Sequence, residues 1–246
     1  MKNNILILAT HWGYYIPLFL KLFLKKDFKN NNNRLIKNYS DFGTKFLIEG
    51  MPNSIICNYS RALWDPNRSL DSDDLFRETD FWWIKIWKFN FPYFIKKLLI
   101  SFYYNNYHNK IESKIKDLEK NNKEIFILDI HDTWNELLGV EYSDDKRRES
   151  LFPEMNIWTV WYKTCSKEFS DKLVAFINKE FRFDSKVDYP YSWWHMVKKY
   201  WLWFNNRQVV QLEFWRYLYM NEKTQEIDFE KMKDLKEKFT RVVEAL

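Results

Sequence analysis

Two of the four histidines in this 246-residue sequence stand where short, mostly apolar runs end. His11 follows the run Ile5–Ala9, and His131 follows the run 124–130. Runs of this kind are typical of central strands that are covered on both faces. Ligand sites in open α/β sheets lie beyond the carboxyl ends of the strands. The sequence therefore places two imidazole side chains, each able to bind a metal ion, where such a site is expected.

A third candidate strand carries an acidic side chain. In residues 209–214, Val210, Leu212 and Phe214 lie on one side of the predicted strand, and Val209, Gln211 and Glu213 lie on the other. Glu213 is therefore opposite the apolar side. Scattered histidines and a glutamate lack the local ligand spacing of a metal-binding motif. The residue types alone thus leave two interpretations open. They form a metal site, or they are hydrogen-bonded core histidines with an exposed or ion-paired Glu213.

The elements that would position these residues alternate between strands and helices. Residues 54–59 predict a further strand, and the polar stretch 141–150 predicts a long surface loop. Apolar periodicity and capping residues predict helices in residues 17–28, in residues 107–120, after Ser170 as N-cap, and after Asp228 as N-cap. This alternation predicts a single α/β domain over residues 1–246 of the phosphorylase/hydrolase-like kind. Its mostly parallel or mixed sheet would carry helices on both faces.

Composition excludes several classes of protein. Hydrophobic residues make up 46% and charged residues 30%, which is typical of a globular rather than a disordered chain. The net charge of +5 is small and the charges are interspersed, so no nucleic-acid partner is expected. Lysines interrupt the apolar stretches 16–24 and 91–100, well short of the ~20 residues of a membrane span. The sequence therefore predicts a cytoplasmic protein without a membrane partner. Its 13 Trp suggest an aromatic-lined cleft.

Six short motifs follow one another along the chain. They are T-H-W-G-Y-Y-I-P, S-D-F-G-T, S-R-A-L-W-D-P-N-R, Y-Y-N-N-Y-H, L-D-I-H-D and Q-L-E-F-W-R-Y-L-Y-M-N-E. In this order they resemble the N-formylglutamate amidohydrolase family, distant relatives of the zinc carboxypeptidases. The resemblance runs from residue 11 to residue 222. Larger or charged residues stand where the family often carries small ones, namely Trp12, Asp132, Trp193 and Trp194.

The resemblance implies one zinc ion per chain, bound by His11, Asp41 and His131. Three protein ligands and an open fourth position are what a catalytic zinc needs. Asp129 is expected to orient a ligand histidine, or to be the third ligand in place of Asp41. Asp41 would then be a helix-cap or turn residue. Glu213 resembles the family's catalytic glutamate, which takes a proton from the attacking water and passes it to the leaving amine.

The motif S-R-A-L-W-D-P-N-R implies the substrate-binding residues. Arg61, Asn67 and Arg68 resemble a clamp for the substrate's carboxylate, because a guanidinium fork suits a carboxylate. Asp65 either holds one of these arginines in place or is a turn residue. Arg216 matches the family's E-x-x-R, and is either a further substrate-binding residue or an ion-pair partner.

The function that the resemblance implies is hydrolysis of an amide bond. The substrate would be a small molecule with a free carboxylate, either an N-acyl (N-formyl) amino acid or a small peptide. Two alternatives stay open, a carboxypeptidase-like peptidase and a non-catalytic, aromatic-lined binding protein on the same scaffold. His108 either belongs to the site or stands in the first turn of an exposed helix, and His195 is expected to be structural.

Overall fold

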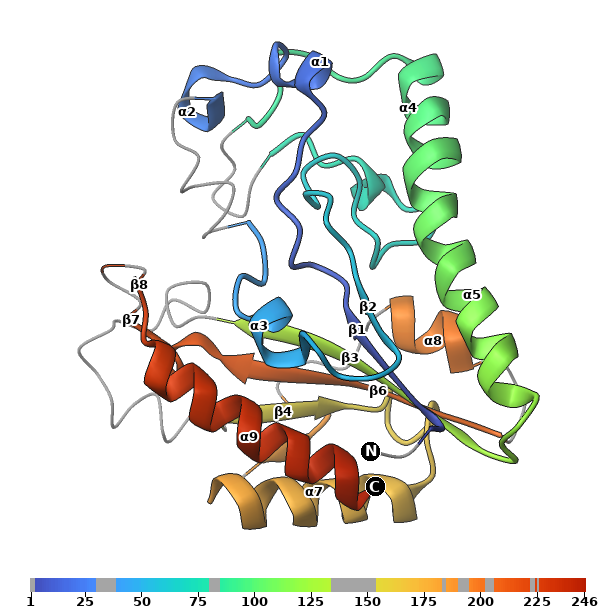
Figure 1. The fold of residues 1–246 in the computed structure, drawn as a ribbon. Coiled ribbons are helices and arrows are strands. Elements are labelled where there is room, and N and C mark those ends of the chain that lie inside the picture. The colour runs from blue at the N-terminus through green and yellow to red at the C-terminus, as the bar shows by residue number, and fades with distance from the viewer. Residues whose placement is uncertain are drawn as a thin grey trace.

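A six-stranded mixed sheet forms the centre of the computed structural model, with helices on both faces (Figure 1). The structure describes residues 3–29, 39–79, 85–133, 154–182, 185–189, 195–201, 206–221, 224 and 226–246. The strands of the sheet are β1 (Ile5–Ala9), β2 (Ser54–Ile56), β3 (Ile125–Thr133), β4 (Met155–Trp158), β5 (Lys186–Val187) and β6 (Arg207–Trp215). A separate pair consists of β7 (Met220–Asn221) and β8 (Glu226–Ile227).

The helices vary in length from single turns to long, regular elements. They are α1 (Leu18–Lys21), α2 (Lys26–Lys29), α3 (Thr44–Ile48), α4 (Tyr93–Leu99), α5 (Asn105–Glu119), α7 (Lys167–Phe181), α8 (His195–Trp201) and α9 (Phe229–Ala245). A π-helical segment, Ile100–Tyr104, joins α4 to α5. Two 3₁₀ turns, Asp73–Leu75 and Arg216–Leu218, complete the helical elements described.

The order of the strands across the sheet brings the candidate site residues to one edge. The order is β2-β1-β3-β6-β4-β5. Strands β2, β1, β3 and β6 run parallel, whereas β4 is antiparallel to β6. Because parallel strands end at the same edge, the carboxyl ends of β1, β3 and β6 lie next to one another. The predicted α/β class with a mostly parallel or mixed sheet is confirmed.

Each face of the sheet packs against its own set of helices. Leu6 and Ile127 belong to the core shared with α5 and α8, and Ile7 and Leu128 to the core shared with α3, α7 and α9. All nine residues of β3 are buried. A strand that is covered on both faces needs such an apolar run, which explains why the sequence signal for β3 was clear.

Two of the predicted helices differ from the observed ones. The stretch 17–28 forms the two short helices α1 and α2, because Leu24 between them pairs with Trp87 in an isolated β-bridge. The helix predicted to begin after Ser170 begins earlier, with Ser166 as its N-cap. The side chain of Ser166 accepts a backbone hydrogen bond at 3.1 Å, while Ser170 is buried within α7.

Other predicted elements agree with the structure at most of their residues. The helix predicted over 107–120 is α5, and Asp228 caps α9 by accepting the N–H of Lys231 at 3.1 Å. The strand predicted over 54–59 ends sooner, at Ile56. The predicted loop 141–150 and the pair Trp193 and Trp194 lie outside the described residues.

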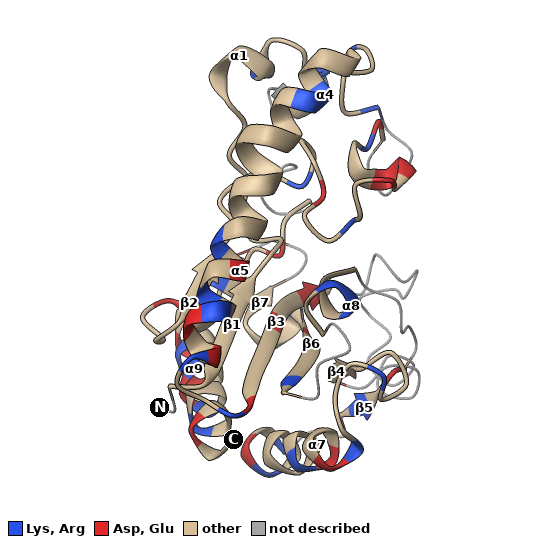
Figure 2. Cartoon of the chain, turned by 90° about the vertical axis from the view of Figure 1, so that its right-hand side faces the viewer, with Lys and Arg blue, Asp and Glu red and all other residues tan. Residues whose placement is uncertain are grey.

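The charged and aromatic side chains are distributed as in a globular protein. Figure 2 shows basic and acidic residues side by side on α5, α7 and α9. Trp64, Trp158 and Trp215 are among the largest fully buried side chains, so these three rings form core rather than line a cleft. In the part of the chain that the structure describes, no helix is both long and apolar enough to cross a membrane.

Candidate active site

The carboxyl edge of the sheet brings the two predicted histidine ligands together. His11 lies just beyond the end of β1, and His131 lies near the end of the neighbouring strand β3. The loop that carries Asp41 returns to this edge, because the N–H of Asp41 donates to the carbonyl of His11 at 2.9 Å. Two strands and a loop thus place three side chains at one point. Along the chain, about 30 residues separate His11 from Asp41 and about 90 separate Asp41 from His131.

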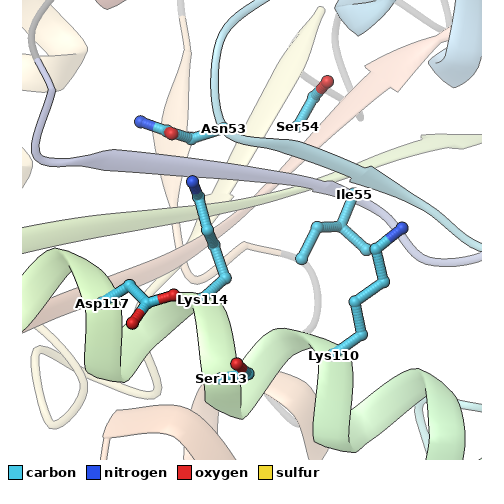
Figure 3. A pocket seen from close by; sticks show the side chains of 7 residues that line it. All are labelled: Asn53, Ser54, Ile55, Lys110, Ser113, Lys114 and Asp117. Atoms are coloured by element: carbon cyan, nitrogen blue, oxygen red, sulfur yellow. The ribbon is translucent and has the colours of Figure 1, made fainter.

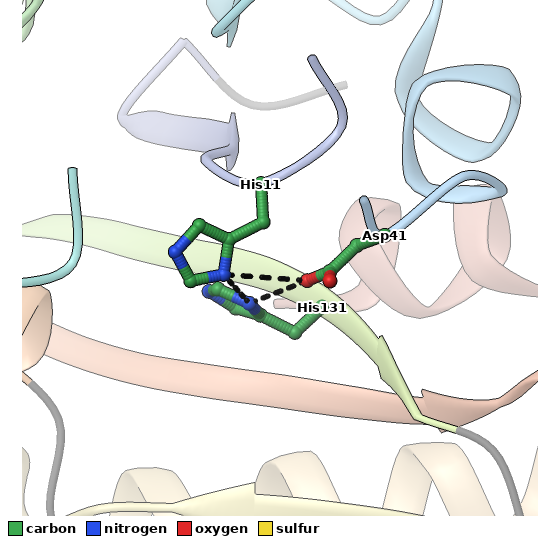
Figure 4. Close-up of side chains that lie close together, drawn as sticks. All are labelled: His11, Asp41 and His131. Atoms are coloured by element: carbon green, nitrogen blue, oxygen red, sulfur yellow. Dashed lines mark hydrogen bonds and ion pairs between the residues drawn. The ribbon is translucent and has the colours of Figure 1, made fainter. Parts of the chain in front are cut away.

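The side chains of His11, Asp41 and His131 converge on a common centre (Figure 4). The Nδ1 atoms of the two histidines lie 3.1 Å apart. Oδ2 of Asp41 lies 2.7 Å from Nδ1 of His131 and 3.6 Å from Nδ1 of His11. All three residues are buried. Their ligand atoms lie within 4.8 Å of one another, which makes this group a candidate metal site.

A second carboxylate holds each histidine ring from the other side. Nε2 of His11 lies 2.7 Å from Oδ1 of Asp65, and Nε2 of His131 lies 2.9 Å from Oδ2 of Asp129. A carboxylate on Nε2 fixes the proton there and leaves the Nδ1 lone pair for a metal. Asp129 thus occupies the position expected of an orienting residue, while Asp41 faces the two Nδ1 atoms.

The electrostatics of the cluster favour a charged Asp41. Burial by itself raises the pKa of Asp41, but the hydrogen bonds with His11 and His131 outweigh it, and the pKa falls well below its usual range. Burial likewise opposes the charged form of His131, yet the neighbouring Asp129 and Asp41 raise its pKa well above the ordinary value. The buried carboxylates thus favour a positive charge at this point, which a bound cation would supply.

The donor atoms are of the types that a zinc ion binds. Zinc binds imidazole nitrogens and carboxylate oxygens at about 2.0–2.2 Å, so tetrahedral neighbours lie roughly 3.3 Å apart. The three distances between the donor atoms of His11, Asp41 and His131 are 3.1, 2.7 and 3.6 Å, on both sides of that value. Three protein ligands leave one position open for a water molecule or a substrate oxygen.

Glu213 lies next to this cluster on the adjoining strand. Its Cα is the register partner of the Cα of His131, and side chains paired in this way project from the same face of the sheet. Oε2 of Glu213 is shielded from solvent and has no hydrogen-bond partner among the described residues. Burial raises the pKa of Glu213 to about 7, although nearby His131 opposes the shift. A carboxylate with such a pKa suits a general base.

The motif S-R-A-L-W-D-P-N-R folds into a buried network around Asp65. Oδ2 of Asp65 accepts from Nη2 of Arg61 at 2.7 Å, and Oδ1 accepts the backbone N–H of Asn67 at 2.9 Å. Asp65 therefore does what each interpretation expected, because it pairs with an arginine and also closes a turn. Its contact with His11 adds a third task, the orientation of a candidate metal ligand.

The remaining two residues of the predicted clamp differ in their surroundings. The amide of Asn67 accepts the N–H of Met196 at 2.9 Å and donates to Gln211 at 3.4 Å, which ties the motif to α8 and β6. Arg68 is more exposed, with 21% of its side chain accessible against 9% for Arg61. Of the three predicted clamp residues, Arg68 is therefore the one that presents a guanidinium at the surface of the network.

Arg216 takes part in a buried ion pair. Its Nε donates to Oδ1 of Asp132 at 2.5 Å, and its Nη2 donates to the carbonyl of Ser40 at 2.5 Å. Only 4% of the Arg216 side chain is exposed. Arg216 is thus an ion-pair partner of Asp132, and its contact with substrate stays a prediction.

Helix α5 supports the site through Tyr107, which the sequence did not single out. The hydroxyl of Tyr107 donates to Thr10, and Thr10 donates to Oδ1 of Asp129 at 2.5 Å. The motif Y-Y-N-N-Y-H contains Tyr107 and was the available signal. His108, its last residue, is buried against Tyr200 and not exposed as one interpretation had it, because α5 turns this side toward the core.

A pocket of about 470 Å³ lies between β2 and α5, away from this cluster (Figure 3). Its lining includes Ser54, Lys110 and Lys114 and none of the predicted site residues. Ser54 is the first residue of β2, so the pocket lies near the amino end of that strand and not at the carboxyl edge. The converging polar side chains, and not this pocket, mark the candidate site.

Comparison with known proteins places the chain in a family. A family model described as N-formylglutamate amidohydrolase matches residues 4–220. No curated protein matches the chain. The crystal structure of an N-formylglutamate amidohydrolase from Ralstonia eutropha JMP134 is 18% identical, with a TM-score of 0.75 over 98% of this chain and 93% of that one. The structure of a gene product from Agrobacterium tumefaciens is 15% identical, with a TM-score of 0.67 over 99% and 92%.

The family match, over residues 4–220, spans most of the sequence. The two solved structures share the fold over nearly their whole length. The chain therefore belongs to the N-formylglutamate amidohydrolase family.

Proposed function

We propose that this chain is a zinc-dependent hydrolase that cleaves the amide bond of an N-acyl amino acid, such as an N-formyl amino acid, or of a small peptide. The substrate carries a free carboxylate. The observation that carries this proposal is the pairing of His131 with Glu213 across β3 and β6. It sets a candidate base beside three converging ligand atoms. Membership in an amidohydrolase family supports the same reaction.

The proposed reaction assigns roles to the metal ion, to Glu213 and to the two carboxylates behind the histidines. When bound, zinc polarises the amide carbonyl and lowers the pKa of a water molecule toward ~7. A carboxylate oxygen of Glu213 takes a proton from the attacking water and then delivers it to the nitrogen of the leaving amine. Asp65 and Asp129 keep the two histidine rings turned so that their Nδ1 atoms face the centre.

The arginines of the S-R-A-L-W-D-P-N-R motif supply the proposed contact with the substrate's carboxylate. Arg61 donates a hydrogen bond to Asp65, and Asp65 also contacts His11. The motif and the proposed metal site therefore share one hydrogen-bond network. Arg68 is the more exposed guanidinium and sits on the same motif. We assign Arg68 the contact with the carboxylate, because a guanidinium can bind it through two parallel hydrogen bonds. Asn67 would hold the motif in place.

The proposal is tested with a panel of substrates on protein purified without a nickel resin. The protein should retain one zinc ion per chain, lose activity when a chelator removes the metal, and regain it when zinc is restored. We expect formate release from N-formyl amino acids, and a strong rise in KM when the substrate's carboxylate is amidated.

Two results would point to another function. Cleavage of carboxyl-terminal peptide bonds without cleavage of formyl amides would identify a carboxypeptidase-like peptidase. A protein that turns over no member of the panel in its zinc-loaded form would fit a binding protein on the same scaffold, and the proposed activity would be wrong.

A further inference from the structure

The residue that follows the predicted ligand His131 is a buried aspartate on the opposite face of the sheet. Successive side chains of a strand point to opposite faces, so β3 directs His131 toward Asp41 and Asp132 the other way. The register partner of Asp132 on β6 is Phe214, which belongs to the core under α3, α7 and α9. Asp132 is only 6% exposed. A carboxylate buried to this extent needs partners.

Three donors converge on the carboxylate of Asp132. Oδ1 accepts from Nε of Arg216 at 2.5 Å. Oδ2 accepts from the hydroxyl of Tyr219 at 2.7 Å and from the backbone N–H of Gly43 at 3.0 Å. Arg216 and Tyr219 belong to the segment that follows β6, and Gly43 belongs to the loop before α3. Asp132 therefore connects the ends of two strands to a loop 89 residues away.

The network holds that loop on both sides of the predicted ligand Asp41. Gly43, two residues after Asp41, donates to Asp132. Ser40, the residue before Asp41, accepts from Nη2 of Arg216 at 2.5 Å. The backbone at Asp41 itself is held as well, by its 2.9 Å hydrogen bond to the carbonyl of His11. The path of the main chain around Asp41 is thus fixed at three points, Ser40, Asp41 and Gly43.

The packing at Gly43 shows how closely the loop fits against this network. A Cβ atom on Gly43 would lie 2.2 Å from Cζ of Tyr219 and 2.4 Å from its hydroxyl oxygen. The ring of Tyr219 is only 2% exposed and its hydroxyl is bonded to Asp132, so it has little freedom to move away. The sequence S-D-F-G-T therefore needs glycine at this position for close approach, because any side chain would push the loop off the ring.

We propose that Asp132, Arg216 and Tyr219 are positioning residues that hold Asp41 at the metal site. Strand β3 then supplies one ligand directly, through His131, and places a second one indirectly, through Asp132. This inference rests on the proposed function, because it takes the two histidines and Asp41 as ligands. It assigns Arg216 to the loop and not to the substrate.

Cobalt(II) binding to the full-length, metal-free protein tests the proposal. Cobalt(II) reports its coordination through its visible absorption spectrum, and its affinity is measured without any substrate. Asp132→Asn, Tyr219→Phe and Gly43→Ala each disturb a different part of the network. We expect each variant to bind cobalt(II) about 10–100-fold more weakly, the usual effect of removing a partner behind a metal ligand, with an altered spectrum. Arg216→Lys should retain more affinity than Arg216→Met.

A matched control is available in Asp188. This carboxylate also holds a loop, because it accepts the backbone N–H groups of Thr159 at 2.8 Å, Val160 at 3.1 Å and Trp161 at 2.8 Å. That loop follows β4 and carries no predicted ligand. Asp188→Asn should lower the melting temperature in the same way as Asp132→Asn, but leave the affinity for cobalt(II) and the spectrum unchanged.

The possible results separate this inference from the proposed function. Wild-type affinity and spectrum in folded Asp132→Asn and Tyr219→Phe proteins would show that the positioning role is wrong while the metal site stands. If the wild-type protein binds no cobalt(II), the proposed metal centre is wrong, and the network is then judged by amide hydrogen exchange of residues 40–44. That exchange should be faster in Tyr219→Phe than in Asp188→Asn, and equal rates would overturn the inference.

Discussion

His131 and Glu213 are direct neighbours across two parallel strands. Adjacent strands lie about 4.8 Å apart, and paired residues of parallel strands project from the same face. A candidate metal ligand and a candidate base are therefore held at a fixed separation by the hydrogen bonds of the sheet. No loop takes part in this spacing. Rigid elements position catalytic groups more accurately than loops do, which favours this pair as the centre of the site.

The first prediction concerns the two histidine ligands. His11→Ala and His131→Ala should each abolish zinc retention and activity but leave a folded protein, because each removes one of three converging donors. Elemental analysis and circular dichroism on the same preparation measure both effects. His195→Ala is the control. His195 lies outside the cluster, so this variant should retain its zinc. One zinc ion per chain at wild-type affinity in both ligand variants would place the site elsewhere.

The second prediction concerns the base. Glu213→Gln keeps the shape of the side chain but cannot accept a proton. We expect kcat to fall by roughly 10²–10⁴ while KM and zinc content stay close to wild type. Melting temperature, zinc content and kcat measured together exclude a loss of folding as the cause. If the zinc-loaded variant turned over at the wild-type rate, another residue would have to be the base.

The third prediction concerns the carboxylate behind His131. Asp129→Asn should weaken zinc binding about 10–100-fold, because an amide orients the imidazole less firmly than the carboxylate 2.9 Å from Nε2. Competition with a chelating dye measures the affinity. Asp117→Asn on the exposed side of α5 is the control and should change nothing. An unchanged affinity in Asp129→Asn would mean that the ring is held by other contacts.

The fourth prediction concerns the substrate's carboxylate. Arg68→Met and amidation of the substrate should each raise KM, because each removes one side of the same proposed ion pair. The two changes together should cost little more than either alone. A double-mutant cycle on kcat/KM gives the coupling free energy. Fully additive losses would show that Arg68 does not contact the carboxylate, and the same cycle on Arg61 would then be the next test.

The fifth prediction concerns acid stability. Burial, together with nearby Lys199 and His195, lowers the pKa of His108 to about 2, whereas an unfolded histidine titrates near 6.5. Between these values the unfolded state binds more protons, so the free energy of unfolding falls as the pH drops below about 6.5. The slope is up to about 1.4 kcal/mol per pH unit. The accumulated loss in the free energy of unfolding at pH 5, relative to neutral pH, is about 2 kcal/mol.

His108→Gln removes this titration while it keeps a polar group near Tyr200. Urea unfolding of the metal-free protein at pH 7 and pH 5 should show a smaller loss of stability in the variant than in the wild type. Comparing the two proteins cancels the contribution of the other histidines. Equal losses in the two proteins would mean that His108 does not cause the acid sensitivity.

The central strands and the edge where they end could be predicted from the sequence. Strands β1 and β3 are buried on both faces, so their residues form mostly apolar runs that are visible in the sequence. The position of His11 and His131 at the ends of those runs then follows from the geometry of parallel strands. Periodicity of two likewise placed Glu213 on the polar side of β6.

Other parts of the site could not be predicted from the sequence. The contacts of Asp132 with Arg216 and Gly43 join segments 84 and 89 residues apart, and no local pattern encodes such contacts. The same holds for the hydrogen bonds that give the Asn67 amide its partners Met196 and Gln211. The resemblance suggested which residues belong to the site, but their mutual contacts depend on the folded arrangement.

The alternation of faces along β3 limits how this strand can evolve. His131 and Asp132 face opposite sides, so inserting or deleting one residue within the strand would exchange their faces. Such a one-residue shift in register would separate His131 from the metal site and Asp132 from Arg216 and Tyr219 in a single event. Every side chain needed for the metal site and for the network would still be present. Lineages of this family that share the His-Asp pair should therefore vary in length within their loops and keep the length of β3 constant.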